Sequence, residues 1–172
     1  MKVSIAALLT LLFGAVSAIA ASSPGAASLN YGYFCAVEPI DEAFAEGTIS
    51  GTVSFVADVP SFISEGSLVP AQLGIGFGVH VRALPEFAGP VTVYIEHPPM
   101  GPNGVTKQVW ETSIGADEPE YLGYTFDMAY ELVTGSWSLS AEAENGTVYS
   151  VDFEVLDAGL MPPTPCGATP LS

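Results

Sequence analysis

The sequence predicts an all-β fold, an antiparallel sandwich of about seven strands in two sheets. Short runs of alternating apolar and polar residues recur along the chain, and clusters of Gly, Pro and Asn separate them. Beyond the N-terminal segment, no run has the apolar spacing of a helix. Each alternating strand has one apolar face, and two facing sheets bury such faces together. A chain of 172 residues is expected to form one domain.

Residues 1–20 have the features of a secretory signal peptide. Met1-Lys2 is the charged start, an apolar run extends from Ile5 to Val16, and small residues favour cleavage after Ala20 or a residue or so later. A membrane anchor is the alternative, but the run is too short to span a bilayer and no basic flank follows it. We therefore expect a periplasmic or secreted protein, not inserted in the membrane once the signal is cleaved.

The chain is strongly acidic, with a formal net charge of −16 and 19 Asp and Glu against 3 Lys and Arg. Beyond the signal segment only Arg82 and Lys107 are cationic, so the protein should repel nucleic acid, and no nucleic-acid partner is expected. Charged residues make up only 13% of the sequence, which indicates solubility rather than electrostatic steering.

Two cysteines occur, Cys35 near the start of the exported part and Cys166 near its end. Disulfides persist in exported proteins, so we predict a bond between the two. Closing so long a loop stabilises a fold by roughly 4 to 5 kcal/mol in the chain-entropy model. Pairing between two molecules is the alternative.

The sandwich is predicted to span residues 48–157. Residues 21–47, rich in Ala, Ser and Gly, are expected to be an irregular arm, and residues 158–172 a Pro-rich tail held mainly by the disulfide. A first strand should begin near Thr48 and end at Val59-Pro60, because Pro cannot continue a strand ladder. Its apolar face would carry Ile49, Gly51, Val53 and Phe55.

The segment from Gln72 to Leu84 has the clearest alternation in the chain. One face carries Leu73, Ile75, Phe77, Val79 and Val81, and the other carries Gly74, Gly76, Gly78, His80 and Arg82. A nucleotide-binding glycine loop would need a strand before it and a helix after it. We interpret these glycines as positions where another backbone or an aromatic ring approaches the strand closely.

The next two strands are expected to pair as a hairpin. The first runs from Val91 to Ile95, and the second, from Val105 to Ile114, places Trp110, Thr112 and Ile114 on one face. Between them, Glu96 to Gly104 contains Pro and Gly residues that force a turn. A further strand follows, from Leu122 to Met128.

A last hairpin is predicted from Glu131 to Val155. Trp137 and Phe153 lie on the apolar faces of its strands and are large enough to anchor a core. Asn145-Gly146 favours a type I′ turn, which needs positive φ at both central residues.

Several motifs resemble a known family. They are Leu73-Gly-Ile-Gly-Phe-Gly-Val, His97-Pro-Pro-Met-Gly-Pro-Asn-Gly-Val, Phe126-Asp and Glu131-Leu-Val-Thr-Gly-Ser-Trp. Together they resemble a small bacterial family of exported domains of unknown function, over roughly Thr48 to Val155. The end of the chain is similar to the last two strands of bacterial immunoglobulin-like domains. The resemblance implies an immunoglobulin-like β-sandwich and an envelope location, and it brings no catalytic residues.

No catalytic constellation is visible in the sequence, so we expect no enzyme and no cofactor. Nucleophilic catalysis needs a base beside the nucleophile, and His80 and His97 are the two imidazoles available. Acidic turns at 117–120 and 142–145 offer oxygen ligands without the spacing of a calcium loop. His97 and Met100 are a soft pair of the kind that copper uses, but no third ligand accompanies them, so no metal site is predicted.

The segment His97, Pro98, Pro99 and Met100 is the candidate binding site. A thioether beside a titratable ring, on a proline-stiffened loop, suits recognition, although the prolines would equally shape a hairpin connection. The predicted function is an exported, non-catalytic structural or protein-binding module of the bacterial envelope. An unidentified envelope protein would be its partner, and we expect a monomer. The alternative is a periplasmic protein that binds a small molecule or a metal.

Overall fold

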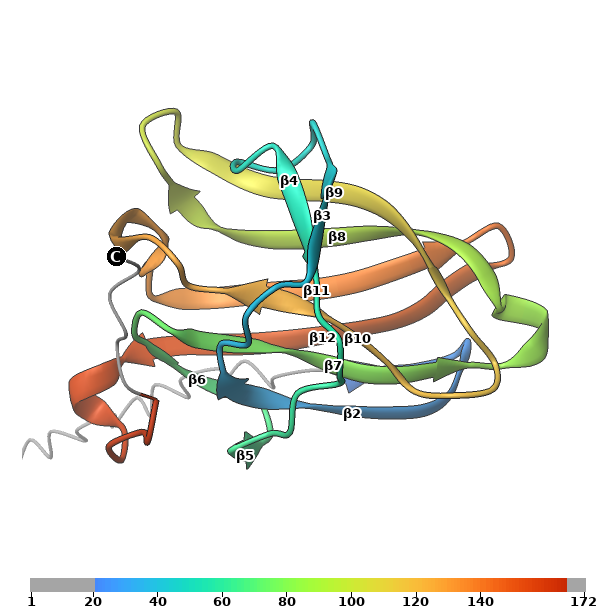
Figure 1. Cartoon of the computed structure of the whole chain (residues 1–172), viewed down its shortest axis with the longest axis horizontal. Helices are drawn as coiled ribbons and strands as arrows, with labels where there is room; N and C mark the ends of the chain where they lie inside the picture. The colour runs from blue at the N-terminus through green and yellow to red at the C-terminus, as the bar shows by residue number, and fades with distance from the viewer. Residues whose placement is uncertain (1–20, 167–172) are drawn as a thin grey trace, which may run out of the picture.

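The computed structural model describes residues 21–166, and the predicted signal peptide and the end of the tail lie outside this range. Twelve strands and three 3-10 helices form the described part (Figure 1). The strands are β1 (Ala21–Ser22), β2 (Ala26–Cys35), β3 (Asp41–Phe44), β4 (Thr52–Phe55), β5 (Ser64–Glu65), β6 (Leu68–Ala71), β7 (Ile75–Ala83), β8 (Gly89–Met100), β9 (Val105–Ile114), β10 (Glu120–Thr125), β11 (Gly135–Ala143) and β12 (Gly146–Asp157). The 3-10 helices are η1 (Pro85–Phe87), η2 (Ala129–Glu131) and η3 (Ala158–Leu160). Within 21–166, no helix is long and apolar enough to cross a membrane.

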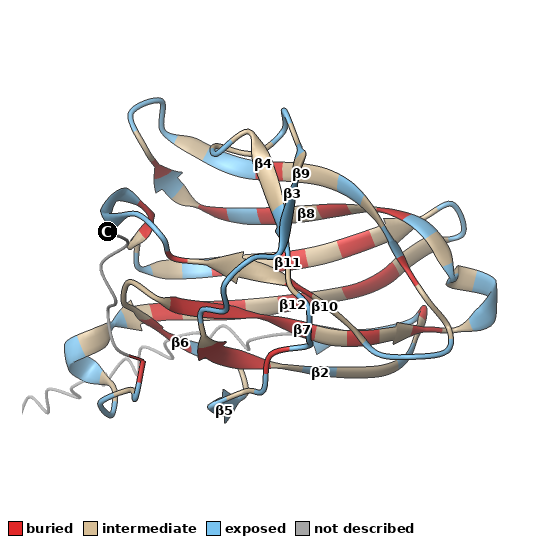
Figure 2. Cartoon of the chain, viewed as in Figure 1, coloured by how far each residue is buried: buried red, intermediate tan, exposed pale blue. Residues whose placement is uncertain are grey.

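Two sheets form the predicted sandwich. The first has the order β1-β12-β11-β8-β9, with β6 parallel to β12, and the second has the antiparallel order β10-β7-β2-β5. Phe77 of the second sheet lies with its ring centroid 5.5 Å from Trp137 and 5.0 Å from Phe153 of the first. Figure 2 shows buried positions alternating along the long strands. The core is therefore the aromatic-rich layer between the sheets, as expected.

The expected irregular arm at residues 21–47 is wrong, because it contains the ten-residue strand β2. This strand pairs with β7 from Ala26 to Cys35 and lies inside the second sheet. Its core-facing residues are Leu29, Tyr31, Tyr33 and Cys35, which share a face with β7 residues of the core. The Ala, Ser and Gly around them suggested loop, but pairing with β7 satisfies the backbone and outweighs that weak local preference.

The first predicted strand is also misplaced. Its regular part is only β4, which pairs with β3 in a separate two-stranded sheet. This hairpin runs across the strands of the first sheet (Figure 1). The amide of Val109 in β9 donates to the carbonyl of Gly47 at 3.0 Å, and the amide of Ile49 donates to Gln108 Oε1 at 2.8 Å. Seven of the described strands have six or more residues, which matches the predicted number of about seven. The set differs from the prediction in that it includes β2 in place of the strand expected at β4.

The glycine face of β7 has the predicted role. Gly32, Gly78 and Gly123 align in one row across β2, β7 and β10. A Cβ on Gly76 would clash with the ring of Phe34, which is 2% exposed although it lies on the outer side of the sheet. The missing side chains thus let an aromatic ring lie directly on the backbone.

The last hairpin has the predicted register, with Trp137 opposite Phe153, but its turn differs. No described residue other than glycine has positive φ, so Asn145 does not adopt the type I′ conformation. Gly146 carries the positive φ, +120°, and the register shifts after Ala141. The bulge adds local twist to the hairpin, which a type I′ turn would otherwise have supplied.

The predicted disulfide joins Cys35 and Cys166, whose Cα atoms are 5.2 Å apart. It ties the end of β2 to the tail. The side chain of Gln72 donates to the carbonyl of Cys166 at 3.2 Å and to Thr164 Oγ1 at 3.0 Å. The described part of the tail is therefore fixed by a covalent bond to β2 of the second sheet and by two hydrogen bonds to Gln72, in the connection between β6 and β7.

Candidate functional site

The predicted binding segment, His97 to Met100, belongs to β8 and not to a loop. The β8 and β9 register shifts between Glu96 and Met100, which marks a bulge in the strand. His97 is 6% exposed and Met100 1%, so the expected recognition pair is buried. Pro98 and Pro99 are more accessible. The bulge turns the imidazole and the thioether inward, which proline content alone does not reveal.

His97 is held as a neutral imidazole by its partners. Its Nδ1 lies 2.9 Å from the carbonyl of Pro98, which can only accept, so Nδ1 carries the proton. Its Nε2 lies 3.2 Å from Gln108 Nε2 and accepts from it. Gln108 Oε1 is occupied by the amide of Ile49, which fixes the orientation of the Gln108 amide. Burial lowers the pKa of His97, in spite of the opposing hydrogen bond to Pro98.

Glu131 organises the adjacent corner between β10 and β11. Its carboxylate is 7% exposed and accepts three hydrogen bonds, from the hydroxyl of Tyr124 at 2.9 Å and the amides of Asp127 and Met128 at 2.7 Å each. Burial and the Glu131 carboxylate together raise the pKa of Tyr124. The ring of Trp137 packs beside His97, with centroids 4.7 Å apart, and its Nε1 donates to Val133. These residues form a closed structural cluster, with each polar atom aimed at another part of the fold.

Among the described residues, no hydroxyl or thiol is paired with an imidazole base. Neither histidine between 21 and 166 is hydrogen-bonded to a hydroxyl or thiol: His97 contacts Pro98 and Gln108, and His80 stacks on Phe62 with centroids 4.0 Å apart. Burial lowers the pKa of His80. No group of three or more His, Cys, Asp or Glu in this range is arranged to hold a metal ion.

The two acidic turns considered as calcium ligands serve their own loops. Glu120 Oε1 accepts the amide of Gly115 at 2.7 Å, and Glu142 Oε1 accepts the hydroxyl of Thr147 at 2.7 Å. A carboxylate that satisfies a local donor is a structural element of its turn.

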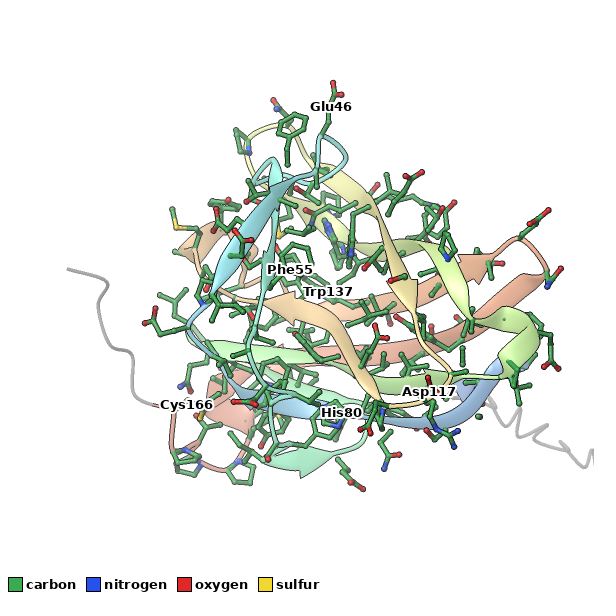
Figure 3. The ribbon with its side chains drawn as sticks, turned by 45° about the vertical axis from the view of Figure 1, so that its right-hand side comes forward. Glu46, Phe55, His80, Asp117, Trp137 and Cys166 are labelled. Carbon is green, nitrogen blue, oxygen red and sulfur yellow. A yellow bond between two sulfur atoms is a disulfide. The ribbon has the colours of Figure 1, made fainter. Side chains whose placement is uncertain are left out.

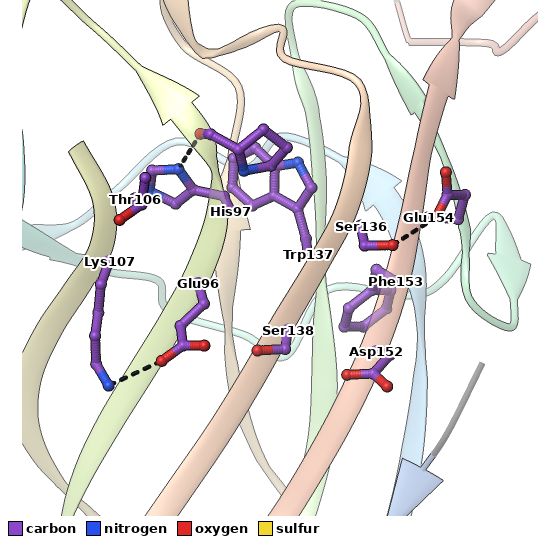
Figure 4. A pocket seen from close by; sticks show the side chains of 11 residues that line it. Glu96, His97, Thr106, Lys107, Ser136, Trp137, Ser138, Asp152, Phe153 and Glu154 are labelled. Atoms are coloured by element: carbon purple, nitrogen blue, oxygen red, sulfur yellow. Dashed lines mark hydrogen bonds and ion pairs between the residues drawn. The ribbon is translucent and has the colours of Figure 1, made fainter. Parts of the chain in front are cut away.

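A shallow, open depression lies on the outer face of the first sheet (Figure 4). The strand register aligns Lys107, Glu96, Ser138 and Asp152 in one row across β9, β8, β11 and β12. Lys107 Nζ lies 2.9 Å from Glu96 Oε1 and 4.4 Å from the ring centroid of Tyr94. Both charged side chains are at least half exposed, so this pair contributes little to stability. The depression offers hydroxyl and carboxylate groups on an open surface.

The β3–β4 hairpin and the segments beside it carry a concentration of exposed apolar side chains. Of the ten large apolar residues that are exposed in the described chain, six lie between residues 37 and 63. They are Val37, Ile40, Phe44, Phe55, Val59 and Ile63. The most exposed of the six are Phe44, at 82%, and Ile40, at 68%. Figure 3 shows Glu46 at the far end of this hairpin, in the loop that joins β3 to β4.

A groove separates this hairpin from the edge of the first sheet. It has a volume of about 480 Å³, and residues of β3, β4, β8 and β9 line it. Its apolar lining comprises Phe44, Val53, Phe55, Val109 and Trp110. The carboxylates of Glu46 and Glu111 lie at the same groove. We name this site the hairpin groove.

Sequence reasoning missed the hairpin groove because it treated Val53 and Phe55 as core residues of a long strand. A signal was present in the preceding segment, where Ile40 and Phe44 stand among the acidic residues Glu38, Asp41 and Glu42. A segment this acidic does not belong in a core, so its large apolar residues predict an exposed apolar surface.

The chain is an all-β, two-sheet sandwich domain with a closed aromatic core and an apolar hairpin across one edge. It belongs to the family described as "Domain of unknown function (DUF3859)", whose model matches residues 22–155. The resemblance to a family of domains of unknown function is thereby confirmed. An immunoglobulin-like protein from Pseudomonas aeruginosa is similar at 21% identity and a TM-score of 0.48, over 82% of this chain and 100% of that chain. Among curated proteins, none matches the sequence significantly.

Proposed function

We propose that this protein is an exported, non-catalytic module of the bacterial cell envelope that binds another protein through the β3–β4 hairpin. The observation that carries the proposal is the exposure of Phe44, at 82%, and Ile40, at 68%, on a hairpin outside the sandwich. Scattered apolar residues need no explanation, but a concentration of them in one stretch of the chain, here residues 37–63, is typical of a protein-binding surface.

Export is supported by two independent features. The first is the charged start, apolar run and small-residue end of residues 1–20. The second is the Cys35–Cys166 disulfide, since such bonds persist mainly in oxidising compartments. Under this proposal, intact-mass measurement of protein recovered from the periplasm or medium gives a chain that begins at Ala21 or close to it. Recovery of the full-length chain from the cytoplasm would contradict export.

The depression on the outer face of the first sheet favours the second candidate, binding of a polar small molecule. Its row of Glu96, Ser138 and Asp152 presents carboxylate and hydroxyl groups to a ligand. Ligand sites, however, usually enclose most of the ligand surface, and this one is open. The hairpin therefore carries the proposal.

The proposed function is tested by photo-crosslinking in the producing bacterium. A photoreactive residue replaces Phe44 in one variant and Phe55 in another, and the control variant carries it at Leu160, which is 78% exposed on η3. We expect a recurrent crosslinked protein from positions 44 and 55 and none from position 160. The same crosslinks from all three positions, or no specific crosslink from the hairpin, would reject the hairpin as a binding surface.

A further inference from the structure

We propose that the hairpin groove binds an extended segment of a partner protein that carries both apolar and cationic side chains. This inference rests on the proposed function and specifies the chemistry of the partner. It follows from the lining of the groove, the free edge of β9 and the charge around both.

The lining of the groove requires apolar anchors in the partner. Phe44, Val53 and Phe55 from the hairpin face Val109 and Trp110 from the edge strand. Aromatic side chains around a groove are the residues that dominate binding energy at protein interfaces. Phe44, at 82% exposed, gains most from being covered.

The free edge of β9 favours an extended partner. β9 is the terminal strand of the first sheet. In the described part of the chain, Val109 is the one β9 residue with a backbone hydrogen bond outside the sheet, to Gly47. Next to it Glu111, an exposed residue that lines the groove, has no backbone hydrogen bond outside the sheet among the described residues. An extended peptide pairs with such an edge and places alternate side chains in the neighbouring pockets.

The charges around the groove require cations in the partner. Glu46 and Glu111 lie at the groove, and further carboxylates stand along the hairpin and the segments beside it, at Glu38, Asp41, Glu42 and Asp58. No Lys or Arg occurs between residues 36 and 63. A partner that brings Lys or Arg beside its apolar residues satisfies both features, because opposite charges across an interface favour association and exclude other partners.

The same charges exclude two other occupants. A second copy of this chain has the same net charge of −16, and the two cations in its described part are engaged: Lys107 pairs with Glu96, and Arg82 donates to the carbonyl of Ala116 at 3.3 Å. Anionic lipid would be repelled by the hairpin carboxylates. The apolar surface of the hairpin is therefore matched to a basic segment of a different protein.

The inference is tested with three labelled probe peptides and the full exported protein. In the first probe Lys alternates with Val and Phe, in the second Glu replaces Lys, and in the third Ser replaces Val and Phe. Fluorescence anisotropy should show binding of the first probe alone, weakened by added salt because the contributing charges are exposed. Equal binding of the second or third probe, or binding of none, would overturn the inference.

Matched variants locate the site. Phe44→Ser should weaken binding of the first probe about tenfold, as loss of an aromatic anchor does, while Leu160→Ser leaves it unchanged. Glu46→Gln with Glu111→Gln should weaken binding and flatten its salt dependence, and Glu118→Gln, in the acidic turn before β10, should do neither. Binding that survives Phe44→Ser and the double Gln variant alike would overturn the assignment to the groove.

The two proposals fail in different ways. If positions 44 and 55 crosslink a partner in the cell but the first probe does not bind, the hairpin remains a binding surface and the basic, apolar partner is rejected. If position 44 gives the same crosslinks as position 160, protein binding by the hairpin is itself rejected, whatever the probes do.

Discussion

Glu131 shows how a single charged residue can be required by a fold without taking part in chemistry. It is buried, yet its two oxygens accept the hydroxyl of Tyr124 and the amides of Asp127 and Met128. A buried carboxylate is tolerated only when its oxygens are satisfied in this way. Glu131, the first residue of the Glu-Leu-Val-Thr-Gly-Ser-Trp motif, is therefore explained by its structural role in the corner between β10 and β11.

Replacing Glu131 should be costly. Glu131→Ala leaves two backbone amides and a hydroxyl without their acceptor, and we expect a loss of about 2 to 3 kcal/mol in the free energy of unfolding. Denaturant unfolding measures it, with Glu154→Ala on the outer face as the control, for which a change within about 0.5 kcal/mol is expected. Equal effects of the two substitutions would contradict the structural role of Glu131.

His97 should make stability depend on pH. Its folded-state pKa is lowered, so the unfolded chain takes up a proton first as the pH falls below about 6.5, and stability is then lost. Stability is full above that pH, where both states are neutral. A proton on Nε2 of His97 would also face the amide group of Gln108, so that two donors would oppose each other and the hydrogen bond would be lost.

The measurement is denaturant unfolding of wild type and His97→Gln between about pH 7.5 and 5.5, a range that isolates histidine titration. The loss on acidification should be smaller in His97→Gln. His80→Gln is measured alongside, because the pKa of His80 is also lowered. An unchanged pH dependence in His97→Gln would show that His97 is not held neutral.

At the scale of elements, the packing of β2 on β7 depends on residues that have no side chain. The ring of Phe34 in β2 occupies the space that a side chain at Gly76 in β7 would fill, so the ring packs directly on the β7 backbone. Gly76→Ala should lower the free energy of unfolding by about 1 to 3 kcal/mol through overpacking. The double variant with Phe34→Leu should lose less than the sum of the two single losses. Additive losses would mean that ring and glycine do not oppose each other.

Long alternating runs made β7, β9, β11 and β12 predictable from sequence. β2 was missed because Ala, Ser and Gly dilute its alternation, and only pairing with β7 reveals its place. The candidate site could not be predicted in the same way. The burial of His97 depends on a bulge, and the exposure of Phe44 depends on β3 and β4 pairing outside the sandwich. Both are tertiary outcomes that local periodicity does not encode.

At the scale of the whole molecule, the disulfide joins positions 131 residues apart in the sequence. The Cys35→Ser, Cys166→Ser double variant should be less stable by roughly 4 to 5 kcal/mol in the chain-entropy model. Thermal unfolding of the variant and of wild type, with and without reductant, measures the loss. Reductant should lower the melting temperature of wild type and leave the variant unchanged. A wild type that is indifferent to reductant would contradict a stabilising bond.

The same bond decides how the molecule responds to a pull on its C-terminal end. Cys166 is linked through the chain to β12 in the first sheet and through sulfur to the end of β2 in the second. Tension applied beyond Cys166 is therefore divided between two sheets that face each other across one core. In the reduced protein the whole load would fall on the end of β12, where it would peel one strand from its neighbours. Formation of the disulfide thus changes the number of strands that carry the load at Cys166 from one, β12, to two, β12 and β2.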